Sequence, residues 1–120
     1  MKHYILSILL ITSLTNCWLM HDTVNLTIRN QSSMTKTVAS HSMNIDSVIL
    51  LSGETKNFHK EFVDEYCSVD FHYQNNNFIE NYIWSPYVDS WPGEWSLIIE
   101  INDSGITFSG DAYREWSQLK

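Results

Sequence analysis

Val24-Asn25-Leu26-Thr27-Ile28-Arg29-Asn30 alternates between apolar and polar side chains from Val24 to Arg29. In an extended chain Val24, Leu26 and Ile28 face one side, and Asn25, Thr27 and Arg29 face the other. A period of two is typical of a β-strand with one buried face. The sequence therefore predicts a strand over residues 24–30, followed by a turn at Asn30–Ser33.

The same alternation returns in Tyr66-Cys-Ser-Val-Asp-Phe-His-Tyr73. It places Cys67, Val69, Phe71 and Tyr73 on one face of a second strand. Shorter strands are expected between polar turns, at residues 35–43 (a weak strand, possible edge), 47–51, 55–62, 78–84, 94–101 and 106–109. Within residues 55–66 the apolar residues also fit the spacing of a helix, so a strand is the favoured but not the sole interpretation there. About eight short strands joined by polar turns predict an all-β fold, a small antiparallel β-sandwich or barrel.

The two ends of the chain are expected to differ from this pattern. The tail, residues 111–120, predicts a short helix capped by Asp111. At the start, Lys2 precedes an apolar run from Tyr4 to Leu14 and a polar stop. This run is shorter than the roughly 20 residues that a membrane-spanning helix needs. The pattern indicates an export signal, with a signal helix that is removed after export.

The residues at the end of this signal, Leu14-Thr15-Asn16-Cys17, resemble the lipobox of bacterial lipoproteins. Leu14 and Cys17 match that pattern, and Asn16 departs from the small residue that usually precedes the Cys. The resemblance implies that Cys17 is acylated (the palmitate-type anchor of lipoproteins) and becomes the new N-terminus. The expected organisation is a signal peptide at 1–16, a lipidated N-terminus with a short connector at 17–23, and one β-sandwich-like domain at 24–120. The expected location is the bacterial cell envelope.

An ordinary secretory signal is the alternative, and it would give a secreted or periplasmic protein. Only Cys17 and Cys67 are present. A lipid on Cys17 leaves Cys67 as a core-facing thiol with no partner cysteine in the chain. Without the lipid, a Cys17–Cys67 disulfide becomes possible in an oxidising compartment. The two outcomes exclude each other.

The charge of the chain argues against polyanionic partners. The chain has 7 basic and 14 acidic residues, for a net charge of −7, and loss of residues 1–16 removes one of the basic residues, Lys2. The basic residues form no cluster, whereas a protein that binds a phosphate backbone needs one. Nucleic acid is therefore not an expected partner, and membrane contact is expected through the lipid anchor instead.

Candidate catalytic groups are weakly arranged in the sequence. Cys67 and His72 point to opposite faces of one strand, which argues against a thiol–imidazole pair. Asp70 and His72 share a face and could bind a metal together with His41 or His59, but no ligand spacing enforces it. Glu94 and Glu100 share a face about 20 Å apart, which is too far for paired carboxylate catalysis. No metal, cofactor or enzymatic activity is therefore expected.

Aromatic residues gather around the two prolines, at Tyr82, Trp84, Tyr87, Trp91 and Trp95. Trp95 is expected in the core, whereas Tyr87 and Trp91 fall on a loop and are candidates for binding a partner protein. The sequence favours a non-catalytic binding or assembly component of the envelope. The alternatives are an inhibitor or immunity-type protein that binds a hydrolase or toxin, and a small hydrolase or metal-dependent enzyme that uses the Asp70–His72 face.

One short motif near the end bears on the inhibitor alternative. Ser109-Gly110-Asp111-Ala112-Tyr113 resembles the Ser-Gly-x-x-Tyr signature of the bacterial lysozyme-inhibitor lipoproteins, which are small β-barrels. In that family the Ser and Tyr lie on the loop that faces lysozyme. The resemblance covers five residues, and the seven residues that follow leave little room for the family's next strand and its basic motif.

Overall fold

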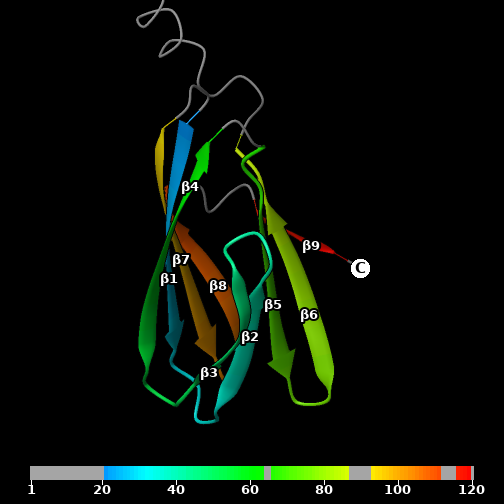
Figure 1. Ribbon diagram of the computed structural model, residues 1–120. Helices are drawn as coiled ribbons and strands as arrows, with labels where there is room; N and C mark the ends of the chain where they lie inside the picture. The colour runs from blue at the N-terminus through cyan, green and yellow to red at the C-terminus, as the bar shows by residue number, and fades with distance from the viewer. Residues whose placement is uncertain (1–20, 64–65, 87–92, 112–115, 120) are drawn as a thin grey trace, which may run out of the picture.

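The computed structural model describes residues 21–63, 66–86, 93–111 and 116–119 (Figure 1). All regular structure in these residues is β-strand, which confirms the predicted all-β, sandwich-like fold. The described part of the chain has no helix long and apolar enough to cross a membrane.

The strands form two sheets. The four-stranded sheet contains, in spatial order, β4 (Thr55–Val63), β1 (His21–Asn30), β7 (Glu94–Asn102) and β8 (Gly105–Gly110). The five-stranded sheet contains β3 (Ile45–Leu50), β2 (Lys36–Ser40), β5 (Val69–Asn75), β6 (Phe78–Trp84) and β9 (Trp116–Leu119).

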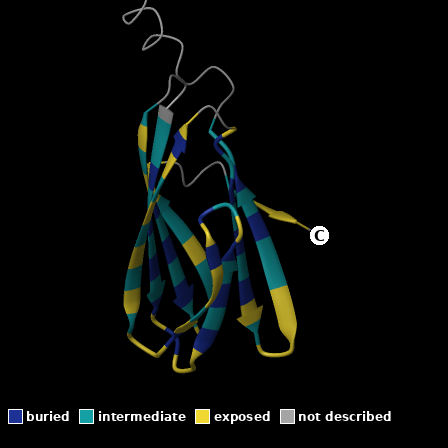
Figure 2. Ribbon diagram, viewed as in Figure 1, coloured by how far each residue is buried: buried dark blue, intermediate teal, exposed yellow. Residues whose placement is uncertain are grey.

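The core lies between the two sheets and follows the predicted alternation. Every second residue is buried from Val24 to Asn30 in β1, from Val69 to Tyr73 in β5 and from Leu97 to Ile101 in β7, and buried positions appear as dark bands along the strands in Figure 2. The largest fully buried side chains are Trp84, Tyr73, Phe71, Leu26, Ile28, Leu50, Leu97, Ile99 and Ile101. Cys67 is also buried, as predicted, although regular pairing in β5 begins only at Val69. Trp95 is half-buried and packs against this core.

Aromatic side chains close one side of the sandwich. Phe108 of β8 stacks on Trp116 of β9, with 4.7 Å between ring centroids. Phe108 also meets Tyr82 of β6 edge-on, at 5.0 Å. These contacts join β8, at the edge of one sheet, to the edge strand β9 and its neighbour β6 in the other. They explain why residues 116–119 form a strand, so the prediction of a helix there is wrong for these residues.

Two further features of the topology differ from the expectation. β1 pairs with β7 in parallel, from Thr23↔Glu94 to Asn30↔Ile101, within an otherwise antiparallel fold. The strand expected at a possible edge, β2, lies inside its sheet between β3 and β5. Alternation identifies the face that a strand buries, but it does not identify the strand's neighbours.

The two ends of the sandwich carry different parts of the chain. β1 starts at His21, three residues earlier than predicted, at the end where β4 finishes and β7 begins. The opposite end, here called the distal end, carries the 31–35 bend, the 51–54 turn and the β5–β6 and β7–β8 hairpin turns (Figure 1). Ten residues of β1 at about 3.3 Å each separate the two ends by roughly 30 Å.

Candidate functional site

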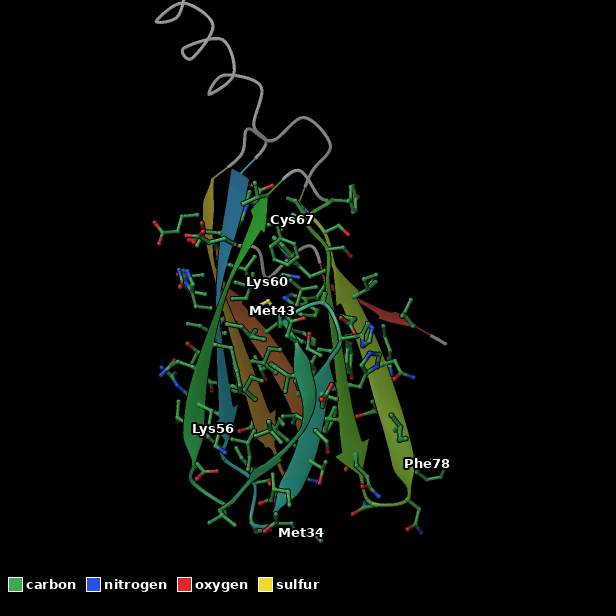
Figure 3. The ribbon with its side chains drawn as sticks, viewed as in Figure 1. Met34, Met43, Lys56, Lys60, Cys67 and Phe78 are labelled. Atoms are coloured by element: carbon green, nitrogen blue, oxygen red, sulfur yellow. The ribbon has the colours of Figure 1, made fainter. Side chains whose placement is uncertain are left out.

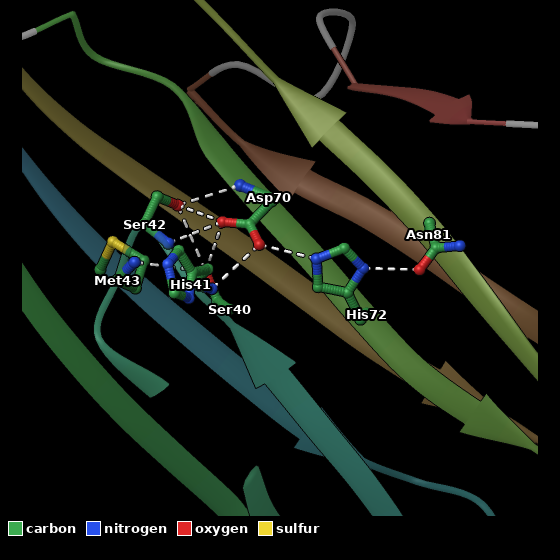
Figure 4. A network of polar contacts seen from close by, with 7 residues as sticks. All are labelled: Ser40, His41, Ser42, Met43, Asp70, His72 and Asn81. Atoms are coloured by element: carbon green, nitrogen blue, oxygen red, sulfur yellow. Dashed lines mark hydrogen bonds and ion pairs between the residues drawn. The ribbon is translucent and has the colours of Figure 1, made fainter. Parts of the chain in front are cut away.

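Asp70, on the outer face of the five-stranded sheet, fixes the turn between β2 and β3 (Figure 4). Its Oδ1 accepts hydrogen bonds from the Ser42 amide at 2.7 Å and the Ser42 hydroxyl at 2.6 Å. Its Oδ2 accepts one from the His41 amide at 2.9 Å and contacts His72 Nε2 at 2.7 Å. Both carboxylate oxygens are thus used to hold this turn against β5.

The electrostatics of Asp70 follow from the same contacts. Burial opposes ionisation and by itself would raise the pKa of Asp70. The hydrogen bonds from Ser42, His41 and His72 outweigh it, and the pKa of Asp70 falls well below its ordinary value. A carboxylate that stays ionised and donor-saturated is a structural anchor for a turn rather than a proton-transferring group.

The metal site considered from the sequence does not assemble in the described residues. His72 engages both ring nitrogens, Nε2 with Asp70 and Nδ1 with Asn81 Oδ1 at 2.6 Å. His59 lies in the other sheet, where Nδ1 contacts Asn25 Oδ1 at 2.7 Å. Across residues 21–63, 66–86, 93–111 and 116–119, no group of three potential metal ligands lies together. Asp70 and His72 share a face, as predicted, opposite to the buried Cys67.

The acidic pair and the Ser-Gly motif also have structural roles. Glu100 pairs with Arg29 at 3.2 Å, whereas Glu94 accepts a hydrogen bond from Asn25 at 3.2 Å, so the two carboxylates have separate partners. Gly110 has φ +95°, and a Cβ there would lie 2.2 Å from the Ser96 carbonyl oxygen. The glycine is therefore required where the end of β8 closes onto β7.

The distal end carries the main exposed apolar surface. Of the eight large apolar side chains that are exposed in the described part of the chain, five lie at this end: Met34, Ile49, Leu51, Phe78 and Ile79. Phe78 has 75% of its surface exposed, and Figure 3 shows it with Met34 at the end opposite to Cys67. Single exposed apolar residues are common, but a group of them is typical of an interaction surface.

Polar contacts, some buried and some exposed, hold the distal bend that presents Met34. Asn30 is fully buried at the end of β1, and its Nδ2 donates to the carbonyls of Met34 at 2.8 Å and Leu50 at 2.9 Å. Ser32 Oγ also donates to the Met34 carbonyl, at 2.9 Å. Ser33 donates its amide and its hydroxyl to Asp103, each at 2.8 Å. Met34 is therefore exposed on a bend that is fixed before any partner arrives, which lowers the entropy cost of binding.

A wedge opens in the five-stranded sheet beside this bend. β2 and β5 pair only at Val38↔Tyr73 and Ala39↔His72, and they separate toward the distal end. Two depressions of about 140 Å³ and about 220 Å³ lie along the separation. The first is lined by Thr37, Val38, Ala39, His72, Tyr73, Gln74 and Ile79, and the second by Met34, Thr35, Lys36, Thr37, Gln74 and Asn76. Exposed Ile79 and Met34 thus line the wedge.

The sequence predicted other residues as the candidate site. Cys17, Tyr87 and Trp91 lie outside the described residues, so their roles stay predictions. The distal residues were missed, although Phe78-Ile79 offered a signal. Two successive bulky apolar residues follow the Gln74–Asn77 turn, and a strand with one buried face can bury only one of them.

Comparison of the sequence with models of protein families and with curated proteins finds no match.

Proposed function

We propose that this protein is an exported lipoprotein of the bacterial cell envelope. In this proposal a lipid on Cys17 holds the domain at a membrane, and the distal end binds a partner protein without catalysis. The observation that carries it is the position of β1, which begins at His21, four residues after Cys17. Four residues span at most about 14 Å. The N-terminal end of the sandwich would then lie close to the lipid, with the distal apolar end turned away from it.

The anchor is tested by replacing its attachment site. Cys17→Ala should abolish metabolic labelling with a radioactive fatty acid and move the protein from the membrane fraction to the soluble fraction. The reason is that stable attachment needs more than one acyl chain, and each buried CH₂ contributes about 0.8 kcal/mol. Cys67→Ala is the matched control and should leave labelling unchanged. Membrane fractionation that does not respond to Cys17→Ala would refute the anchor.

The chemistry of Cys67 gives an independent test of the same proposal. Cys67 is buried at the N-terminal end of the domain (Figure 3). We expect it to resist iodoacetamide in the folded protein and to react after unfolding in urea without any reductant. A thiol that appears only after reduction would instead indicate the Cys17–Cys67 disulfide, and with it the secreted or periplasmic alternative.

The distal surface is tested by crosslinking in intact cells. A photoreactive residue at position 78 should give a discrete protein adduct, and one at position 63 should not, because Val63 is exposed at the opposite end. Met34→Ser with Ile79→Ser should remove the adduct at position 78. These exposed substitutions should change the free energy of unfolding by no more than about 0.5 kcal/mol each. Equal adducts from positions 63 and 78 would contradict a distal binding surface.

A further inference from the structure

Lys36 is a buried lysine in the wedge between β2 and β5. Only 7% of its surface is exposed, and it lines the larger depression with Met34, Thr35, Thr37, Gln74 and Asn76. Lysine is rarely buried to this extent unless its charge has partners. The surroundings of its ammonium group therefore need an explanation.

The described residues give this ammonium few acceptors. An ammonium group has three N–H donors. Among the described residues, the hydrogen bond that Lys36 Nζ makes is to Asn75 Oδ1, at 3.5 Å, which is the outer limit of such a bond. One long hydrogen bond leaves donor capacity on this ammonium, and the other residues that line the depression with Lys36 are uncharged.

One acidic residue, Asp103, interacts with Lys36 through its charge. Asp103 is fully exposed, and hydrogen bonds from the Ser33 amide and hydroxyl are the main reason that its pKa is lowered; the charge of Lys36 adds a smaller lowering. Asp103 Oδ1 accepts both Ser33 hydrogen bonds at 2.8 Å. Asp103 does not line the depression.

We propose that the wedge binds a carboxylate group, with Lys36 as its cation and the polar side chains of Thr35, Thr37, Gln74 and Asn76 as further contacts. A single cation surrounded by hydroxyl and amide groups matches the charge of a singly charged anion such as a carboxylate. A hydrogen bond from an ammonium to a carboxylate is stronger than one between neutral groups. Ile79 and Met34 lie beside the wedge for the apolar part of the ligand. This inference names the chemistry of the partner proposed above and rests on that proposal only for the identity of the ligand as part of a protein.

The test uses three small probes on the isotope-labelled mature protein, isolated as the cell produces it. N-acetyl-Ala-Ala has a free C-terminal carboxylate, its C-terminal amide has none, and N-acetyl-Glu-amide has a carboxylate only in its side chain. We expect both acids to shift the backbone amide signals of Thr35–Thr37 and Gln74–Asn76 saturably, in the millimolar range, and the amide to shift none. The acid that binds more tightly shows whether the carboxylate of the natural ligand belongs to a chain terminus or to an acidic side chain.

Variants separate charge recognition from structural damage. Lys36→Gln should weaken the binding of the acids about tenfold or more, because a hydrogen bond to a charged group is lost. Lys36→Arg should keep binding within a few-fold. Lys56→Gln is the matched control, because it also removes a lysine charge but lies outside the wedge. Lys56 is on β4 and pairs with Glu54 at 3.8 Å. If Lys36→Gln does not fold, the comparison of the acid probes with the amide probe on the natural protein still shows whether the wedge recognises a carboxylate.

Two results would overturn the site: no saturable shift with either acid, or equal shifts with acid and amide. Neither result depends on the lipid. If the natural protein takes up no labelled fatty acid but binds the carboxylate probes, the anchor is refuted and the site stands. If it is labelled but binds neither acid, the site is refuted and the anchor stands.

Discussion

Replacing Trp84 by alanine should lower the free energy of unfolding by about 3–5 kcal/mol. Trp84 ends β6 and is completely buried. Its ring meets Trp95 of β7 edge-on, with 5.6 Å between centroids, and so joins the two sheets. Truncation removes this contact and leaves a cavity that the two paired sheets cannot easily close. Urea unfolding followed by circular dichroism measures the loss.

Tyr66→Ala is the matched control for this prediction. Tyr66 is an aromatic residue near the same end of the domain but has 75% of its surface exposed. Its truncation should change the free energy of unfolding by no more than about 0.5 kcal/mol. A loss below about 1 kcal/mol for Trp84→Ala would show that the two sheets do not pack through this residue.

Asp70→Asn should destabilise the fold by about 1.5–3 kcal/mol at neutral pH. The side chain of Asp70 is 20% exposed and accepts hydrogen bonds from Ser42, His41 and His72. Asparagine has nearly the same shape but carries no charge, and its amide nitrogen cannot accept these bonds. The β2–β3 turn should therefore loosen. Urea unfolding measures the free energy of unfolding of Asp70→Asn and of the control Asp46→Asn. Asp46 is an exposed acidic residue of the same hairpin, so the control shows how much of the loss comes from removing a negative charge alone.

The effect of Asp70 should depend on pH in one direction. The pKa of Asp70 is lower in the folded chain than its ordinary value of 3.8. Its contribution is therefore fully present above about pH 4 and is lost as the pH falls from there toward the folded pKa. The difference in stability between the natural protein and Asp70→Asn should shrink over that acidic range. A difference that stays constant, or that equals the effect of Asp46→Asn, would contradict the role given to Asp70.

The sequence predicted the parts of the fold that depend on local pattern. The alternation in Val24–Asn30 and in Cys67–Tyr73 identified the buried faces of β1 and β5, and polar turns located the hairpins. The parallel pairing of β1 with β7 could not be predicted, because a strand's period of two contains no information about its neighbour. At the C-terminus, pairing with β6 and the stacking of Trp116 on Phe108 outweighed a helical spacing of apolar residues.

The candidate site was harder to predict because it depends on buried polar residues. Asn30 and Lys36 look like surface residues in the sequence, and both are buried through partners that are distant along the chain. Asn30 reaches the Leu50 carbonyl, and Lys36 reaches Asn75. These contacts arise only after the sheets assemble. The wedge itself follows from where β2 and β5 stop pairing, which no pattern in either strand indicates.

The mass of the mature N-terminal peptide tests the central claim most directly. Protein isolated from its own cells is digested, and the peptide that contains Cys17 is analysed by mass spectrometry. The proposal predicts a peptide that begins at Cys17 and carries a thioether-linked diacylglyceryl group. A peptide that begins elsewhere with unmodified Cys17, or one that is linked through a disulfide to the peptide containing Cys67, would contradict it.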